Sequence, residues 1–134
     1  MTKKIFKSNI LVAVVVLIFG IACVMAILYQ HFGKQIDTEL KKEATYLAYG
    51  VEQNGVDYLN QIKEKDDRIT YIAEDGTVLY DNQADASSME NHSDRKEVQE
   101  ALKSGSGRAE RDSKTLSQKT IYYALRLSDN TVLR

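Results

Sequence analysis

The residues with the clearest capacity for chemistry lie in the second half of the sequence, where histidine, arginine and tyrosine recur at short intervals. The planar guanidinium of arginine matches a carboxylate or a phosphate bidentately. If the loop, helix start and strands that carry these residues meet in space, they could hold such a ligand. The candidate ligand-binding residues are His92, Arg95, Arg108 and Tyr123, within a wider set that also contains Asp94, Arg111, Tyr122 and Arg126.

A purely structural explanation of the same residues stays open. Asp94 stands three residues before Glu97, which is the spacing of a capping box, so both could serve to start a helix. Arg95 would then pair with a nearby acid, Arg108 and Arg111 would be solvated strand residues, and the tyrosines would pack against neighbours.

The sequence contains no recognisable catalytic constellation. His31 lies beside an apolar run, His92 lies in a polar stretch, and the single cysteine, Cys23, lies inside the apolar run. The segment Gly105-Ser106-Gly107 precedes a predicted strand, whereas a phosphate-binding glycine loop precedes a helix. We therefore predict no catalytic residues and no metal ligands in this chain.

An amphipathic pattern begins at Ile36, in a helix that is expected to run straight out of the apolar segment before it. Its apolar positions recur at spacings of three and four, with charged residues between them. Such a stripe could cover one face of the following sheet, or it could pair with a second copy of the chain as a parallel helical dimer. The dimer would use Ile36, Leu40, Ala44 and Leu47. A break at Asn54-Gly55 separates this helix from a short helical pattern over 56–62.

A β-hairpin is predicted from the strands 69–73 and 78–81. Asp75-Gly76 between two β-rich runs is a strong hairpin signal. With these two residues as the loop, Tyr71 faces Tyr80 and Ile72 faces Leu79 on the other side, so both faces should be covered.

The remaining elements are a short helix and three strands. The helix follows Asp94 and ends at the glycines 105 and 107. The strands cover 108–112, 120–127 and 131–134, with a turn over 113–119. The strand 120–127 places Ile121, Tyr123, Leu125 and Leu127 on one face. Because the sequence ends within a strand, we expect it to be a fragment of a longer polypeptide.

A run of uncharged, mostly apolar residues from Ile10 to Leu28 positions all of these elements relative to a membrane. As a helix it is about 28 Å long, close to the hydrocarbon thickness of a bilayer. Three lysines precede it, so the positive-inside rule predicts a cytoplasmic N-terminus and places residues 30–134 outside the cell membrane. A cleaved signal peptide and a lipidated Cys23 are the competing explanations, but Ile27 and Leu28 extend the run past any small-residue cleavage site.

The composition narrows the choice of partners. All 19 acidic residues follow the apolar run, so the outer part is mildly acidic and does not suit nucleic acid or an anionic lipid surface. That part also lacks cysteine, and therefore has no disulfide and no cysteine metal site.

The hairpin and the helix after it resemble a known family. The stretch 68–81 with its Glu-Asp-Gly-Thr turn, followed by His92-Ser-Asp-Arg-Lys-Glu-Val-Gln-Glu-Ala-Leu102 and the glycine stop, resembles the extracytoplasmic PAS-like (Cache-type) sensor domain of bacterial membrane histidine kinases. The pattern is most similar to the phosphate-regulon, PhoR-type sensor kinases. The same exterior domain also serves chemotaxis receptors and cyclases.

This resemblance implies an α+β fold, in which an N-terminal transmembrane helix continues into a long helix and leads to a PAS-like antiparallel sheet with a short helix. The expected organisation is a cytoplasmic N-terminus (1–9), a transmembrane helix (10–29), a helical linker (30–66) and a sensor domain (67–134). The function implied is signal sensing in a homodimeric two-component histidine kinase. Its missing cytoplasmic part would use ATP and magnesium and would act on a response regulator. A sensor for a chemotaxis receptor or cyclase, and a membrane-tethered binding protein without kinase output, are the alternatives.

Overall fold

The computed structural model describes residues 2–62, 67–112 and 119–134. Within them the chain forms α1 (Thr2–Asn54), α2 (Val56–Gln61), β1 (Thr70–Ile72), β2 (Val78–Asp81), the 3₁₀ turn η1 (Ala86–Ser88), α3 (Lys96–Ser104), β3 (Ser106–Asp112), β4 (Lys119–Arg126) and β5 (Val132–Leu133). The predicted turn over 113–118 lies outside the described residues. The chain divides into two units, one up to Thr38 and one from Glu39 to Arg134.

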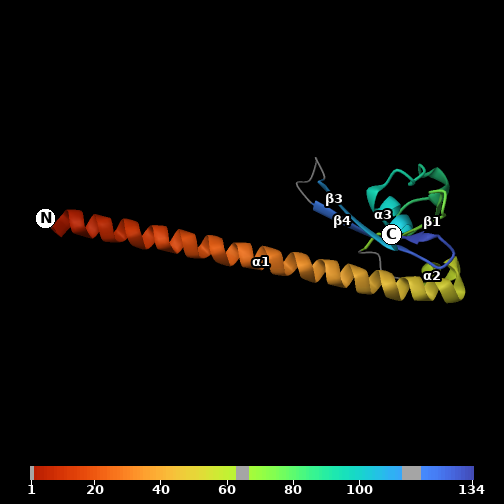
Figure 1. Ribbon diagram of the computed structural model, residues 1–134, viewed down its shortest axis with the longest axis horizontal. Helices are drawn as coiled ribbons and strands as arrows, with labels where there is room; N and C mark the ends of the chain where they lie inside the picture. Colours follow the sequence, from red (N-terminus) through yellow and green to blue (C-terminus); the bar gives the residue numbers. More distant parts are fainter. Residues whose placement is uncertain (1, 63–66, 113–118) are drawn as a thin grey trace. The chain divides into compact units, whose positions relative to one another are not determined.

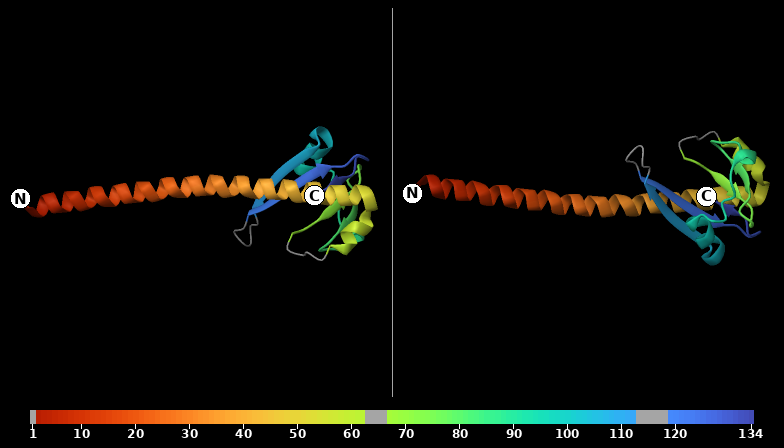
Figure 2. Two further views of the ribbon diagram at one scale, coloured as in Figure 1. Left: turned by 90° about the horizontal axis from the view of Figure 1, so that it is seen from below. Right: turned by 90° about the horizontal axis from the view of Figure 1, so that it is seen from above.

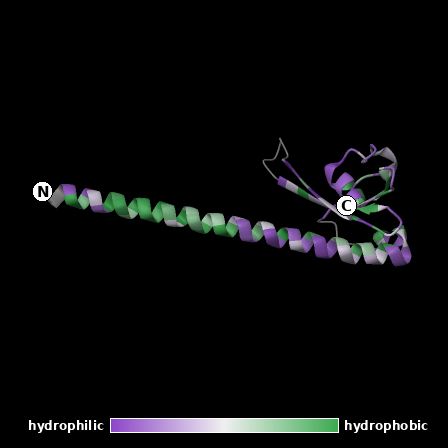
Figure 3. Ribbon diagram, in the orientation of Figure 1, coloured by the Kyte–Doolittle hydropathy of each residue, from purple (hydrophilic) through white to green (hydrophobic). Residues whose placement is uncertain are grey.

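The first unit is the N-terminal part of α1. In Figure 3 most of this part of the helix is coloured as hydrophobic, and polar residues become frequent further along. The large apolar side chains of the run Ile10–Leu28 are between 42% and 70% exposed, which is unfavourable in water but natural in a bilayer. By length and composition, α1 is the one helix in the described part of the chain that could cross a membrane.

The second unit is built on a five-stranded antiparallel sheet with the order β2-β1-β5-β4-β3. The hairpin of β3 and β4 is its longest pair, and both views of Figure 2 show it extending beyond the other strands. The last strand in sequence, β5, lies in the centre of the sheet between β1 and β4. β5 thus joins the β1–β2 hairpin to the β3–β4 hairpin in one sheet.

Two hydrophobic clusters cover the two faces of this sheet. On one face, Ala48 and Val51 of α1 and Leu59 of α2 pack with Tyr71 and Leu133 of the sheet. On the other face, the α3 side chains Val98 and Ala101 pack with sheet residues Ile72, Ala124 and Val132. Residues alternate along a strand between its two faces, so β5 contributes Val132 to the α3 face and Leu133 to the α1 face. The second unit therefore has three layers.

The hairpin turn differs from the prediction by one residue. Tyr71 pairs with Tyr80 as predicted, but Ile72 pairs with Val78 rather than Leu79, because the register shifts at a bulge. The cause is the turn, in which Gly76 N–H donates to Ala73 O and Ala73 N–H donates to Thr77 O. This is a three-residue loop closed by a left-handed glycine, not a two-residue one. Leu79 is consequently 47% exposed, so the prediction that both faces of the hairpin are covered is wrong at this position.

The predicted capping box at the start of α3 is wrong. The N-cap of α3 is Arg95, and no side chain caps it. Asp94 is 79% exposed, and the Glu97 carboxylate is fully buried because it binds arginines from β3 and the end of β5. The end of the helix does follow the prediction, because Gly105 adopts the left-handed conformation at the C-cap.

The predicted fold class is confirmed. A long N-terminal helix precedes an antiparallel sheet with a short helix across it, and the helix break at Asn54-Gly55 and the short helix after it occur where the sequence places them. Ile121, Tyr123 and Leu125 of β4 are partly buried, and Leu127 is buried.

Candidate functional site

A polar pocket of about 330 Å³ lies on the face of the sheet that α3 covers. This volume suits a small molecule. Its walls come from the segment before β1, the segment between η1 and α3, and the strands β3, β4 and β5. The residues that line it are Arg68, Met89, Glu90, His92, Arg95, Arg111, Tyr122 and Arg134.

The segment between η1 and α3 is held over the sheet by the hairpin turn. His92 N–H donates to Gly76 O at 2.8 Å, and the Asn91 side chain donates to Asp75 O at 2.9 Å. Gly76 has a φ of 88°, and a Cβ there would run into Asn91 and Ser93. Glycine is thus required at this position both for its conformation and for the close approach that places His92 at the pocket.

A buried carboxylate lies beside the pocket. Both oxygens of Glu97 accept hydrogen bonds from Arg111 Nη2, at 2.9 and 2.7 Å, and Arg134 Nη1 reaches Oε1 at 3.5 Å. The Glu97 side chain is fully buried and that of Arg134 is 7% exposed, while that of Arg111 is 34% exposed. One buried carboxylate therefore faces two guanidinium groups.

The ring of Tyr122 supports both guanidinium groups. The Arg111 Cζ lies 4.4 Å from the centroid of the ring and the Arg134 Cζ lies 4.8 Å from it, which are cation–π distances. Burial lowers the pKa of Arg134, and the nearby Glu97 opposes that effect. Arg134 stays charged, because an arginine pKa is too high to be crossed at physiological pH.

A second ion pair fixes Arg68 at another wall of the pocket. Arg68 Nε donates to Asp81 Oδ2 at 2.9 Å, and the Thr70 hydroxyl donates to the same oxygen at 2.9 Å. Burial alone would raise the pKa of Asp81, but these hydrogen bonds and those from two backbone N–H groups outweigh it, so the pKa is lowered. Asp81 therefore remains ionised and keeps Arg68 in place.

Two buried polar atoms at the pocket have no hydrogen-bond partner within the described residues, namely His92 Nδ1 and Arg95 Nε. His92 is only 4% exposed. Arg95 forms an ion pair with Asp94, as the structural explanation predicts, but the 3.6 Å between its Nε and the Asp94 Oδ1 is beyond hydrogen-bond distance. Burial, followed by the charges of Arg134, Arg95 and Arg68, lowers the pKa of His92, so its imidazole is neutral at physiological pH. Buried polar groups are nearly always satisfied, and these two are placed to receive a ligand.

Of the four predicted ligand-binding residues, the structure brings two together. His92 and Arg95 line the polar pocket. Arg108 does not: its guanidinium pairs with Glu110 at 2.6 Å, and its place in β3 puts it on the other face from Arg111. Tyr123 likewise lies on the other face from Tyr122.

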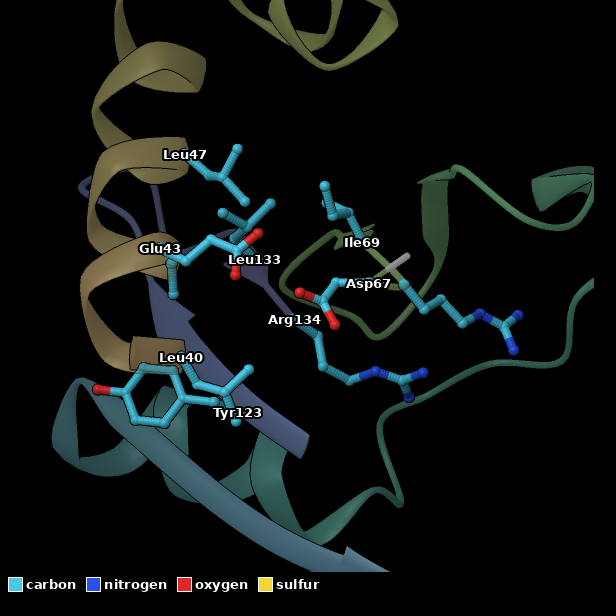
Figure 4. Close-up of a pocket in the computed structure, with 10 residues that line it drawn as sticks. Leu40, Glu43, Leu47, Asp67, Ile69, Tyr123, Leu133 and Arg134 are labelled. Atoms are coloured by element: carbon cyan, nitrogen blue, oxygen red, sulfur yellow. The ribbon is translucent and has the colours of Figure 1, made fainter. Parts of the chain in front are cut away.

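Tyr123 instead lines a small, mostly apolar pocket of about 50 Å³ between α1 and the sheet. Figure 4 shows Leu40, Glu43 and Leu47 of α1 opposite Ile69 and Leu133. A wider hollow of about 540 Å³ adjoins it and is also lined by Tyr122. The lining residues that the two share are Leu40, Asp67, Arg68, Tyr123 and Arg134. The small pocket has room for little more than water.

The predicted dimer stripe is divided between two environments. Leu40, Ala44 and Leu47 are half-buried and line the small pocket, and Leu47 also packs against the cluster on the α1 face. Ile36, in the first unit, is 43% exposed. Most of the stripe therefore covers the chain's own sheet, and Ile36 is open to a partner.

Sequence reasoning missed four residues that line the polar pocket, namely Arg68, Met89, Glu90 and Arg134, and it missed Glu97 as an ion-pair partner. Glu97 carried a usable signal, because it falls beside Val98 and four residues before Ala101, on the buried stripe of α3. An acid on such a stripe calls for a basic partner. Among the described residues, no group of three His, Cys, Asp or Glu side chains could hold a metal ion.

Comparison with known proteins gives one match. Residues 30–132 match the family model described as Single Cache-like. The search of curated proteins finds no match. The matched range contains α3, the whole sheet except Leu133 of β5, and every residue of the polar pocket except Arg134.

Proposed function

We propose a function from one premise: this chain belongs to the single Cache-like family, whose members are extracytoplasmic sensor domains of signalling receptors. The chain is the signal-sensing and membrane-anchoring part of a two-component sensor histidine kinase of the PhoR type. The observation that carries this proposal is the family match over 30–132, which begins within α1, directly after the apolar run that is suited to a membrane.

Membrane anchoring is supported by the first half of α1. Its apolar side chains are exposed on all sides, and Lys4 and Lys7 precede them while the acidic residues follow. The proposed topology places the N-terminus in the cytoplasm and residues 30–134 outside the bacterial cell membrane.

The three-layer unit offers a route from the pocket to the membrane helix. Arg134 lies at the pocket, and the neighbouring Leu133 packs with Ala48 and Val51 of α1 on the other face of the sheet. Backbone hydrogen bonds of 2.8 Å in both directions join Arg134 to Thr70. A ligand that moves Arg134 therefore acts on the strand that supports α1, and a small shift of α1 would alter the geometry of a homodimer.

The kinase output rests on the resemblance of the hairpin and the His92–Leu102 stretch to PhoR-type sensors. The proposal includes a cytoplasmic part that binds ATP and magnesium, phosphorylates a histidine of its own and passes the phosphoryl group to a response regulator. His31 and His92 are not that histidine, because both lie on the outer side of the membrane in the proposed topology.

The test is reconstitution of the complete receptor from the native gene into membrane vesicles. With labelled ATP and magnesium, we expect acid-labile phosphorylation of the receptor and its transfer to a response regulator, both abolished by EDTA. A receptor that takes up no phosphate, but synthesises a cyclic nucleotide or controls a chemotaxis kinase, would overturn the kinase proposal and keep the sensor domain in a different receptor class.

A further inference from the structure

We propose that the polar pocket binds a small molecule through a single anionic head group, a carboxylate or a phosphate, held by Arg95, Arg134 and His92. This inference names the ligand class of the proposed sensor. It rests on the proposed function only for the claim that binding acts as a signal.

The first argument is the charge around Glu97. Arg111 and Arg134 share this one buried carboxylate, and Arg111 takes the two shorter hydrogen bonds. Among the described residues, the guanidinium of Arg134 is left with one hydrogen bond of 3.5 Å and the ring of Tyr122, although it has five N–H donors and its side chain is only 7% exposed. A buried charge needs a close partner, and a second anion beside Arg134 would supply it.

The second argument is that two other residues of the pocket have polar atoms without a hydrogen-bond partner. His92 Nδ1 and Arg95 Nε are buried and without a hydrogen-bond partner among the described residues, and both residues line the same pocket as Arg134. Arg95 can donate to an oxygen of the ligand, and neutral His92 can donate through Nδ1 in one tautomer. His92, Arg95 and Arg134 thus each bring a hydrogen-bond donor to the lining of the same pocket.

The third argument limits the ligand to one charged group. Glu90 lines the pocket, and the carboxylates of Asp81 and Glu97 pair with its lining residues Arg68 and Arg111. A second anionic group would meet these carboxylates without a cation of its own. The volume of about 330 Å³ further restricts the ligand to a small molecule.

The inference is tested by titrating the full chain in detergent micelles with sodium acetate and, separately, with sodium phosphate. Sodium chloride at the same ionic strength is the reference. We expect one of the two probes to bind saturably in the millimolar range, and its identity names the head group. Arg95→Gln should weaken binding about tenfold or more, because a charge-assisted hydrogen bond is lost. Arg108→Gln is the matched control, since it removes an arginine outside the pocket, and it should bind as the wild type does.

A second measurement does not depend on any variant folding. The imidazole NMR signals of His92 should move when the binding probe is added to the wild-type chain, while those of His31 should not. If neither probe binds beyond chloride, or if Arg95→Gln and the wild type bind equally, the inference is wrong. Binding that leaves the output of the reconstituted receptor unchanged would instead retain the anion site and overturn its sensory role.

Discussion

Replacing Glu97 by glutamine removes the buried negative charge between Arg111 and Arg134 at almost constant volume. Breaking a buried ion pair generally costs about 3–5 kcal/mol of folding free energy. Here part of the loss is recovered, because the Arg111 side chain is 34% exposed and glutamine keeps one acceptor oxygen. We therefore expect Glu97→Gln to lower the free energy of unfolding by roughly 2–3 kcal/mol.

The assay is urea unfolding of the full chain in mild detergent, followed by tyrosine fluorescence. The chain has eight tyrosines and no tryptophan, and four of the tyrosines, Tyr71, Tyr80, Tyr122 and Tyr123, lie in the sheet. This signal therefore includes the sheet, whereas circular dichroism would be dominated by α1. An effect of this size should also lower the thermal midpoint by about 10 °C or more.

Glu100→Gln is the matched control for this prediction. Glu100 lies one turn later on α3, and its side chain is 44% exposed and pairs with Lys96 at 3.8 Å. An exposed pair of this kind contributes less than about 1 kcal/mol. Equal losses in the Glu97 and Glu100 variants would refute the reasoning, because they would show that the buried carboxylate contributes no more than a surface one.

Four further outcomes are expected. The lowered pKa of His92 means that the unfolded chain binds a proton more readily than the folded chain does. The contribution of neutral His92 to the free energy of unfolding should therefore be complete above about pH 6.5 and decrease below it. In unfolding curves measured at a series of pH values, His92→Gln should remove this decrease. Asp94→Ala should change the free energy of unfolding by less than about 0.5 kcal/mol, since Asp94 caps no helix; a loss above about 1 kcal/mol would restore the capping box. A cysteine introduced at Ser87 should react with an impermeant thiol reagent on whole cells, and labelling only after lysis would reverse the topology. A cysteine at Ile36 should cross-link two subunits in membranes more readily than one at Thr38, and equal yields would argue against a dimer through this face.

Local signals were enough to predict the elements of the fold. The stripe from Ile36 to Val51, the Asp75-Gly76 turn and the glycine after α3 each depend on a few neighbouring residues, and each element forms where it was predicted. The hairpin register failed by one residue because the choice between two-residue and three-residue loops depends on whether Gly76 closes the turn, which the dipeptide alone does not decide.

The site was harder to predict because it depends on contacts between distant residues. Arg68 and Arg134 flank short strands without any local pattern. Arg68 is held at the pocket by Asp81 of β2, and Arg134 reaches it because β5 enters the centre of the sheet. The strand period of two could have improved the prediction: residues separated by an odd number along a strand face opposite sides. By this rule Arg108 and Arg111 point to opposite faces of the sheet, and so do Tyr122 and Tyr123, so all four could not line the pocket on the α3 face.

The separation of the layers in the second unit has a consequence for how such sensors diversify. The segment from Met89 to Arg95 supplies half of the pocket lining, yet it has no residue in the hydrophobic cluster that joins α1 to the sheet. Substitutions there can change which molecule is recognised without altering the packing that supports α1. Libraries randomised over 89–95 should therefore yield receptors with new ligand preferences and an unchanged output, whereas changes at Leu133 should disturb the response to every ligand.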